Sequence, residues 1–354
     1  MSLIRVKQYF IFMALFALVI AFKTEASCTA VKDGQRVPEM IKRGECYELQ
    51  GNNQFPDKTL IEGKLFLKAG SRLDIRNNVE IKVQKKGEFG IRGLLSLQDG
   101  AVLNLEEFGH LNVEGELYIK KNSYISMSRS STLDGPGKIR FFPSSSLRMG
   151  RDSMVKTGGI LEFDHAALES ASANLENLGS ISIENESRLI INGNSDIKNR
   201  GRFVMDKSSV MTLTDTSRLT NMKYIELSGS LKLTNTASVQ NRLMFSLKDT
   251  SKVEFEDGAY LNNQHIFSFD GLFDMRSHSR FENKRNLQIG DKAVLSLYDS
   301  STFINSGTVY DKGTVYLYSD GFQNKNIFYI NDLKQSRNVE DVLRKATPKL
   351  PVEY

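Results

Sequence analysis

A repeat of about 22 residues extends through most of this chain, and it constrains the fold more than any other feature. Short segments that alternate apolar and polar residues return at this interval, as in Gly115-Glu-Leu-Tyr-Ile and Gly137-Lys-Ile-Arg-Phe. Alternation with a period of two is typical of a strand that buries one face. A fixed repeat of this length indicates units that bury their apolar faces against one another, because one unit alone cannot form a core.

Equivalent apolar residues fall into three columns, which predict three short strands in each repeat. The first column contains Leu73, Leu95, Leu117, Ile139, Ile160, Ile181, Phe203, Ile225, Leu243, Phe267, Leu287 and Val309. The second contains Ile125, Leu147, Leu168, Leu189, Met211, Leu231, Val253, Phe273, Leu295 and Leu317. The third contains Leu133, Met154, Leu175, Ile197, Leu219, Val239, Leu261, Phe281 and Phe303. Irregular steps between members mark the places where we expect the connecting loops to change length.

Turn residues support the same register independently. A column of asparagines stands in phase with the strands: Asn177, Asn199, Asn221, Asn241, Asn263, Asn283 and Asn305. Asparagine is common in turns, and identical stacked amides can bond to one another along the stacking axis. A second column places small residues where the chain must bend: Ser195, Ser217, Ala237, Ala259, Ser279 and Ser301. We therefore expect a structural asparagine ladder.

These columns predict an all-β fold, a right-handed single-stranded parallel β-helix with three strands per coil of about 22 residues. The pattern resembles the solenoid of pectin-lyase-like proteins, phage tailspikes, and filamentous or autotransporter adhesins over roughly residues 61–320. The handedness follows from the general rule for parallel crossovers. Such a resemblance is specific for fold and weak for function.

The start of the chain is typical of a secretory signal peptide. Arg5 and Lys7 precede an apolar run over residues 9–22, and cleavage is expected after Ala26. A lipoprotein signal ending at Cys28 is disfavoured, because Glu25 stands where such signals have an aliphatic residue. We expect an exported protein, at the cell surface, outside the cell or in a periplasm, with no transmembrane segment in the mature chain.

The two ends of the predicted solenoid need covers, since open strand edges recruit other chains. Residues 27–60 show no clear repeat and are predicted to form an N-terminal cap with a disulfide between Cys28 and Cys46. The β-helix is expected over residues 61–327 and a C-terminal cap and tail over 328–354.

Helical spacing in the C-terminal segment predicts a short capping helix. It would begin at the N-cap Asn338 and end before Pro348. Its apolar face would consist of Val339, Val342, Leu343 and Ala346.

Charge argues against nucleic acid as a partner. The net charge is only +5 over 354 residues, whereas nucleic-acid-binding proteins usually carry a concentrated basic face. A glycan or a cell-surface protein is the expected partner, and a homo-oligomer, including a fibre such as a trimeric tailspike, remains an alternative. An autotransporter is disfavoured, because no run of amphipathic strands for a membrane barrel follows the repeats.

One column of carboxylates is a candidate metal site. Glu162, Glu184 and Asp206 follow one another at 22-residue steps. Stacked carboxylates can hold calcium or act as acid and base on a polysaccharide, but they can equally form a solvated surface column. The four histidines, His110, His165, His265 and His278, do not have metal-ligand spacing. No cofactor is therefore expected, apart from the calcium that this column would bind.

Aromatic residues divide into two groups. Most late phenylalanines, among them Phe245, Phe255, Phe269 and Phe281, match the inward phase and are expected in the core. Four tyrosines near the C-terminal end are mostly out of that phase: Tyr298, Tyr310, Tyr316 and Tyr318. Outward tyrosines suit sugar stacking or a protein interface, so we regard these four as candidate ligand-binding residues.

Two functional hypotheses follow. The first is an exported, non-catalytic β-helix, adhesin-like or associated with an envelope or matrix, that binds a glycan or protein partner along its lateral face. The second is a polysaccharide lyase or hydrolase that uses the acidic column, although no catalytic residue can be assigned. The catalytic motifs of β-helix polygalacturonases do not occur at matching positions.

Overall fold

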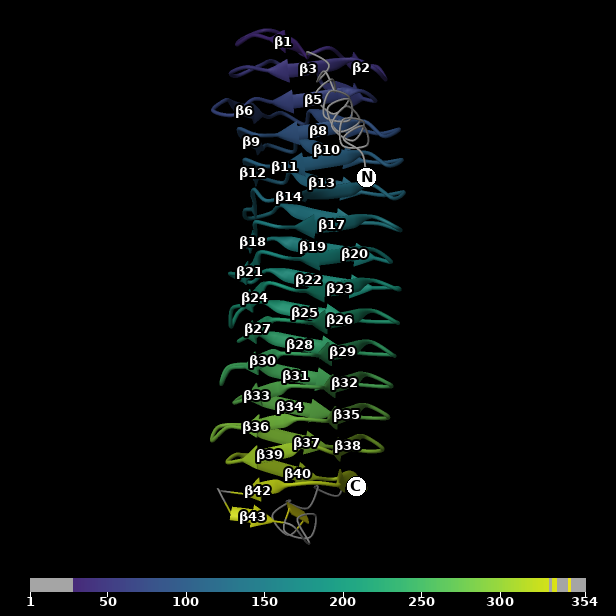
Figure 1. Cartoon of the computed structure of the whole chain (residues 1–354), viewed down its shortest axis with the longest axis vertical. Helices are drawn as coiled ribbons and strands as arrows, with labels where there is room; N and C mark the ends of the chain where they lie inside the picture. The colour runs from purple at the N-terminus through teal and green to yellow at the C-terminus, as the bar shows by residue number, and fades with distance from the viewer. Residues whose placement is uncertain (1–27, 331–332, 336–342, 345–354) are drawn as a thin grey trace, which may run out of the picture.

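The computed structural model describes residues 28–330, 333–335 and 343–344, and these form one long stack of short strands (Figure 1). The strands belong to three sheets of 15, 14 and 14 strands. Neighbouring strands are parallel, apart from one antiparallel pair at the C-terminal end. The predicted parallel β-solenoid with three strands per coil is confirmed.

Sheet 1 contains β1 (Thr29–Val31), β3 (Cys46–Leu49), β5 (Lys64–Leu67), β8 (Glu88–Ile91), β11 (His110–Val113), β14 (Thr132–Gly135), β17 (Met154–Thr157), β20 (Asn174–Asn177), β23 (Asp196–Asn199), β26 (Arg218–Asn221), β29 (Ser238–Asn241), β32 (Tyr260–Asn263), β35 (Arg280–Asn283), β38 (Thr302–Asn305) and β41 (Gly321–Asn324). Sheet 2 contains β6 (Arg72–Ile75), β9 (Leu94–Leu97), β12 (Glu116–Ile119), β15 (Lys138–Phe141), β18 (Ile160–Asp164), β21 (Ser180–Glu184), β24 (Arg202–Met205), β27 (Tyr224–Leu227), β30 (Met244–Leu247), β33 (Ile266–Phe269), β36 (Asn286–Ile289), β39 (Thr308–Asp311), β42 (Phe328–Ile330) and β43 (Leu333–Gln335). Sheet 3 contains β2 (Met40–Ile41), β4 (Lys58–Ile61), β7 (Glu80–Val83), β10 (Val102–Leu105), β13 (Tyr124–Met127), β16 (Ser146–Met149), β19 (Ala167–Ala171), β22 (Arg188–Asn192), β25 (Val210–Leu213), β28 (Ser230–Leu233), β31 (Lys252–Phe255), β34 (Leu272–Met275), β37 (Val294–Leu297) and β40 (Thr314–Leu317).

From β5 onward the chain passes from sheet 1 to sheet 2 to sheet 3 and returns to sheet 1 one coil further along. Each coil therefore has three corners, and the corner between sheet 3 and sheet 1 carries the site described below. The register fixes which residues stack, as in Glu88, His110 and Thr132.

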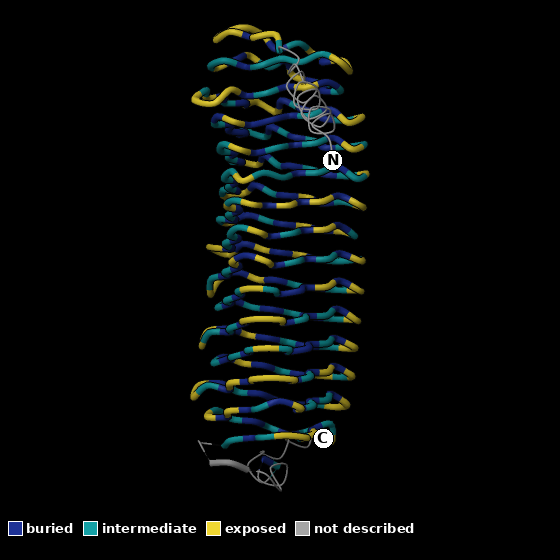
Figure 2. The backbone as a smooth tube through the Cα atoms, in the orientation of Figure 1, coloured by how far each residue is buried: buried dark blue, intermediate teal, exposed yellow. Residues whose placement is uncertain are grey.

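Apolar side chains at alternate strand positions fill the interior, and Figure 2 shows buried residues recurring in every coil. The later coils are filled by phenylalanine, as the sequence predicts. Phe267, for example, is 1% exposed, and its ring centroid lies 5.3 Å from that of Phe245.

The predicted columns are right except at four members. Leu161, Val155 and Phe245 occupy the places that the sequence assigned to Ile160, Met154 and Leu243. The three displaced residues are 38–40% exposed. The fourth is Leu317, which the sequence placed above Leu295. Val315 takes that place instead, and Leu317 is buried at the next inward position, where it stacks on Leu297. Each slip occurs where two or more apolar residues lie close together, so that hydrophobicity alone does not define which one points inward.

The asparagine ladder is confirmed. Its members are the last residues of consecutive sheet 1 strands, and each amide nitrogen donates to the side-chain oxygen of the next asparagine at 2.7–2.9 Å. Asn324 adds one further member, at 2.8 Å from Asn305. The predicted small residues from Ser195 to Ser301 are all buried at the corner between sheets 3 and 1.

Regular strand pairing begins earlier than expected. Within the segment predicted as an N-terminal cap, β1 pairs with β3, and β2 pairs with β4. Here Thr29 stacks on Tyr47, only 18 residues away, so a search for a period of 22 misses these coils. The predicted Cys28–Cys46 disulfide is present and joins the start of this region to β3.

At the other end, β43 pairs antiparallel with β42 and ends the regular stack. Leu343 and Arg344 are helical, and Arg344 donates to the carbonyl oxygen of Ser319 at 2.9 Å. The remainder of the predicted capping helix, like the predicted signal peptide, lies outside the described residues. Within the described part of the chain, no helix has the length and apolar character needed to cross a bilayer.

Candidate functional site

The corner between sheet 3 and sheet 1 carries a column of unusual turns in the first half of the molecule. The turns after β7, β10 and β13 each place two consecutive non-glycine residues at positive φ. The pairs are Lys85 and Lys86, Glu107 and Phe108, and Arg129 and Ser130, with φ between 48° and 68°. This left-handed region is uncommon for residues that carry a side chain. Asparagine and aspartate adopt it more readily than the other non-glycine residues.

Backbone hydrogen bonds between coils hold these turns in place. The amide of Lys86 donates to the carbonyl oxygen of Glu107 at 3.2 Å, and that of Phe108 donates to Arg129 at 3.1 Å. The left-handed conformation aims these N–H groups along the solenoid axis. The turns therefore stack on one another as regularly as the strands, and the strain is maintained by neighbouring coils.

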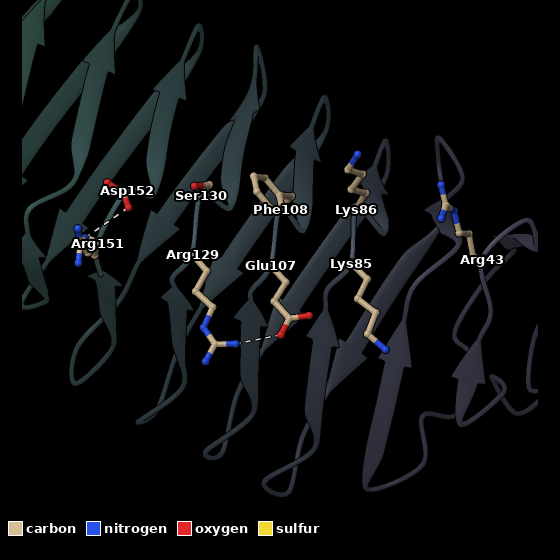
Figure 3. A pocket seen from close by; sticks show the side chains of 9 residues that line it. All are labelled: Arg43, Lys85, Lys86, Glu107, Phe108, Arg129, Ser130, Arg151 and Asp152. Atoms are coloured by element: carbon tan, nitrogen blue, oxygen red, sulfur yellow. Dashed lines mark hydrogen bonds and ion pairs between the residues drawn. The ribbon is translucent and has the colours of Figure 1, made fainter.

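The two residues of each turn send their side chains to opposite sides (Figure 3). Lys85 and Arg129, on one side, are ion-paired, Lys85 with Glu62 at 2.8 Å and Arg129 with Glu107 at 2.9 Å. The hydrogen bond from Lys85 lowers the pKa of Glu62, so this pair stays charged near neutral pH. On the other side lie Lys86, Phe108 and Ser130. Of these only Lys86 is charged, and its ammonium group makes no ion pair among the described residues.

Phe108 is the most unusual residue of this column. The residue is 59% exposed, more than any other large hydrophobic residue that the structure describes. A bulky residue at positive φ is a conformational outlier, and such outliers cluster at functional positions. The ring projects from the turn and is free to contact a ligand from solution.

A groove surrounds this ring. It is lined by Phe108, Lys86 and Arg43 together with the neighbouring turns, as far as Arg151 and Asp152 (Figure 3). A second groove follows toward the N-terminus over sheet 1 and shares Arg43 and Lys86 with the first. An aromatic face beside cationic side chains can stack on a sugar ring while the cations contact polar or acidic groups.

The structure takes Glu162 out of the column of three predicted metal ligands, whereas Glu184 and Asp206 stay in phase directly after the paired residues Ile183 and Met205. Glu162 stacks on Ser182 within β21, and its carboxylate lies 3.3 Å from the Lys138 ammonium group, so its predicted stacking on Glu184 is wrong. Asp164 is the residue in register with Glu184. The mismatch arises because the coil from β18 to β21 advances 20 residues, as in the pairing of Ile160 with Ser180, whereas Glu162 and Glu184 are 22 residues apart.

Two carboxylates near that position, those of Asp164 and Asp206, accept hydrogen bonds from neighbouring groups. Asp164 accepts hydrogen bonds from Asn185 at 2.9 Å and Arg140 at 3.1 Å, and these, the one from Asn185 foremost, lower its pKa. Burial acts to raise the pKa of Asp206, but hydrogen bonds from Ser209 and from the Asn185 backbone outweigh it and lower the pKa. No group of three or more His, Cys, Asp or Glu side chains in the described part of the chain is placed to hold a metal ion.

The four predicted tyrosines lie on two different faces. Tyr298 and Tyr318 follow strands of sheet 3 and stack with ring centroids 4.9 Å apart, with Tyr316 beside them. Burial, followed by the two neighbouring tyrosines, raises the pKa of Tyr318. Tyr310 instead projects from sheet 2 and stacks on Tyr329 at 5.0 Å. The predicted tyrosines therefore do not form one ligand-binding surface.

Sequence reasoning missed the Phe108 turn, because nothing in Glu107-Phe108 has the composition of a turn. The available signal was the phase of Gly87 and Gly109, which stand 22 residues apart and directly before strands of sheet 1. Comparison with protein-family models, with curated proteins and with solved structures gives no match to this chain.

Proposed function

We propose that this chain is an exported, non-catalytic binding protein, adhesin-like or associated with an envelope or matrix, that holds a glycan along the corner between sheets 3 and 1. The observation that carries the proposal is Phe108, a strained and exposed aromatic residue in a groove that also contains cationic side chains. Backbone outliers of this kind cluster at ligand-binding and active sites, and an exposed aromatic face gives a ligand a large apolar contact area.

The regularity of the solenoid supports a binding function. Successive coils present the same corner at intervals of about 4.8 Å, the spacing between strands of a sheet. An extended polymer that lies along the axis meets equivalent positions in several coils, and weak contacts add when one chain makes all of them. The Cys28–Cys46 disulfide suits an exported protein.

The enzymatic alternative has weaker support. A general acid for glycoside cleavage needs a raised pKa, whereas the pKa values of Asp164 and Asp206 are lowered by their hydrogen bonds. Groups of this kind stabilise turns and stay ionised, which favours a structural role for this part of the surface.

A glycan array followed by titration calorimetry tests the proposal. We expect Phe108→Asn to lower affinity for the selected glycan at least tenfold, because stacking on an aromatic ring is lost. Asparagine tolerates positive φ, so this variant keeps the turn and should melt no lower than the native protein.

The matched control is Tyr310→Asn, which removes a 42% exposed aromatic residue from sheet 2. It should leave affinity unchanged. Equal affinity of Phe108→Asn and native protein, or the absence of any glycan ligand for the native protein, would contradict the proposed function.

A further inference from the structure

We propose that the notch between Arg43 and Lys86 is a subsite for an acidic group, a carboxylate or sulfate ester, on a linear glycan. This inference rests on the proposed function and specifies the chemical class of its ligand. It is carried by the shape of three consecutive turns, by the charge that remains unpaired there, and by the position of Phe108 further along the same corner.

The notch arises from a change in turn length. The turns before β3 and before β8 each have four residues, but the turn between β4 and β5 consists only of Glu62 and Gly63. The backbone of this short turn lies close against the turn before β3, in the preceding coil. A Cβ atom on Gly63 would lie 2.3 Å from the Lys42 carbonyl oxygen, a separation that only glycine permits. The second groove passes over Gly63, with Arg43 on one side and Lys86 on the other.

Ion pairing leaves positive charge at this position. Three of the four glutamates that line the second groove are ion-paired: Glu62 with Lys85 at 2.8 Å, Glu88 with Lys64 at 3.1 Å and Glu48 with Lys68 at 3.8 Å. The fourth, Glu45, accepts a hydrogen bond from the Lys42 backbone amide at 2.8 Å and keeps its negative charge, so it offsets one of the two cations that remain. Arg43 and Lys86 make no ion pair among the described residues, although most cations on the surrounding coils do. Two long cationic side chains that flank one hollow can converge on a single anion.

The backbone that carries both cations is fixed before a ligand arrives. Cys46 follows the Arg43 turn closely, and its disulfide to Cys28 ties this turn to the first strand. Lys86 is held at a φ of 68° by the hydrogen bond from its amide to Glu107. Pre-organisation of this kind lowers the ordering cost that binding would otherwise incur.

The distance to Phe108 indicates how the ligand lies. The notch is level with the β4–β5 turn, and Phe108 belongs to the second turn beyond it, so the two are about 10 Å apart along the axis at the usual strand spacing. An extended sugar chain parallel to the axis would place its acidic sugar at the notch and a sugar one or two units away on the ring. A linear acidic polysaccharide has this arrangement, whereas a compact anion would reach only the notch.

Affinity measurements with matched polymers test the subsite. The probes are hyaluronate and its carboxyl-reduced neutral form, dextran sulfate and dextran, and a single-stranded DNA oligomer. The variants are Arg43→Gln and Lys86→Gln. The control is Lys121→Gln, which also removes a lysine at positive φ, but from the corner between sheets 2 and 3.

We expect each notch variant to weaken binding of at least one acidic polysaccharide roughly tenfold, the usual effect of losing a charged hydrogen bond, and to reduce its salt dependence. Lys121→Gln should have no effect. The neutral polymers should bind more weakly than their acidic forms and should not distinguish the notch variants from native protein.

Several results would overturn the inference while leaving the proposed function intact. One is equal affinity for acidic and neutral forms, with both still lost in Phe108→Asn. Another is unchanged affinity for acidic forms in both notch variants. DNA binding as tight as that of the acidic glycans, with the same response to the variants, would indicate a general polyanion site and would also overturn it.

Discussion

Asp311 is the only residue with a charged side chain among the buried residues that the structure describes. It ends β39 and points inward, between Ile289 and Ile330 of the neighbouring strands. Its carboxylate accepts a hydrogen bond from the Gly313 amide at 3.1 Å. Burial raises the pKa of this carboxyl group to about 7, only partly offset by that hydrogen bond.

This pKa makes the last coils less stable at neutral pH than at acid pH. The folded state favours the protonated acid, so the stabilisation is complete below the unfolded pKa of 3.8 and is lost as pH rises toward about 7. The shift corresponds to about 4 kcal/mol at 1.36 kcal/mol per unit. We expect Asp311→Asn, which cannot ionise, to be more stable than the native protein at pH 7.5 and to vary less between pH 4 and 7.

Urea denaturation at a series of pH values measures this difference. Asp291→Asn, at an exposed position nearby, controls for the loss of one negative charge. An unchanged pH profile for Asp311→Asn would show that Asp311 does not cause the effect.

At the scale of the strands, the asparagine ladder ends abruptly at its N-terminal side. Asn177 donates to Asn199 at 2.7 Å, but its own buried side-chain oxygen has no hydrogen-bond partner. The residue stacked on it in the preceding coil is Thr157, which is also buried, and before Thr157 the column continues with Gly135. A buried acceptor without a partner is destabilising.

Thr157→Asn should extend the ladder by one member. Its amide nitrogen would donate to the side-chain oxygen of Asn177, as the amide nitrogen of Asn177 donates to Asn199. We expect a gain of about 1 kcal/mol in the free energy of unfolding, the usual net value of one hydrogen bond. The gain should disappear when Asn177 is replaced by Ala, and a stabilisation that survives this replacement would show that the new hydrogen bond is not its source.

The ladder also shows what sequence can predict at this scale. Seven asparagines in phase defined the stacking correctly, because chance does not place the same polar residue at one position of seven successive repeats. Neighbouring apolar residues did not, since either Ile160 or Leu161 fits a strand pattern. The Phe108 turn was out of reach for a different reason. Its conformation is imposed by hydrogen bonds from adjacent coils, and the sequence indicates it only through the 22-residue spacing of Gly87 and Gly109.

At the scale of the whole molecule, each coil contacts chiefly the coils before and after it, so stability is expected to vary along the rod. The N-terminal coils are the shortest, with only 18 residues between the stacked Thr29 and Tyr47. The Cys28–Cys46 disulfide joins the residue before β1 to the first residue of β3 in these short coils. A closed loop of this size restricts the unfolded chain by about 3 kcal/mol in the chain-entropy model.

Replacing both Cys28 and Cys46 with Ser should therefore open one end of the rod and leave the other intact. Native-state hydrogen exchange should show faster exchange in β1 and β3 and unchanged exchange in the asparagine ladder, because destabilisation passes only through successive coil interfaces. Since the Arg43 turn lies inside the disulfide loop, the same variant should lose affinity for acidic glycans more than for neutral ones. Faster exchange throughout the rod would instead indicate that the solenoid unfolds as one cooperative unit, and would contradict the nearest-neighbour description on which this prediction depends.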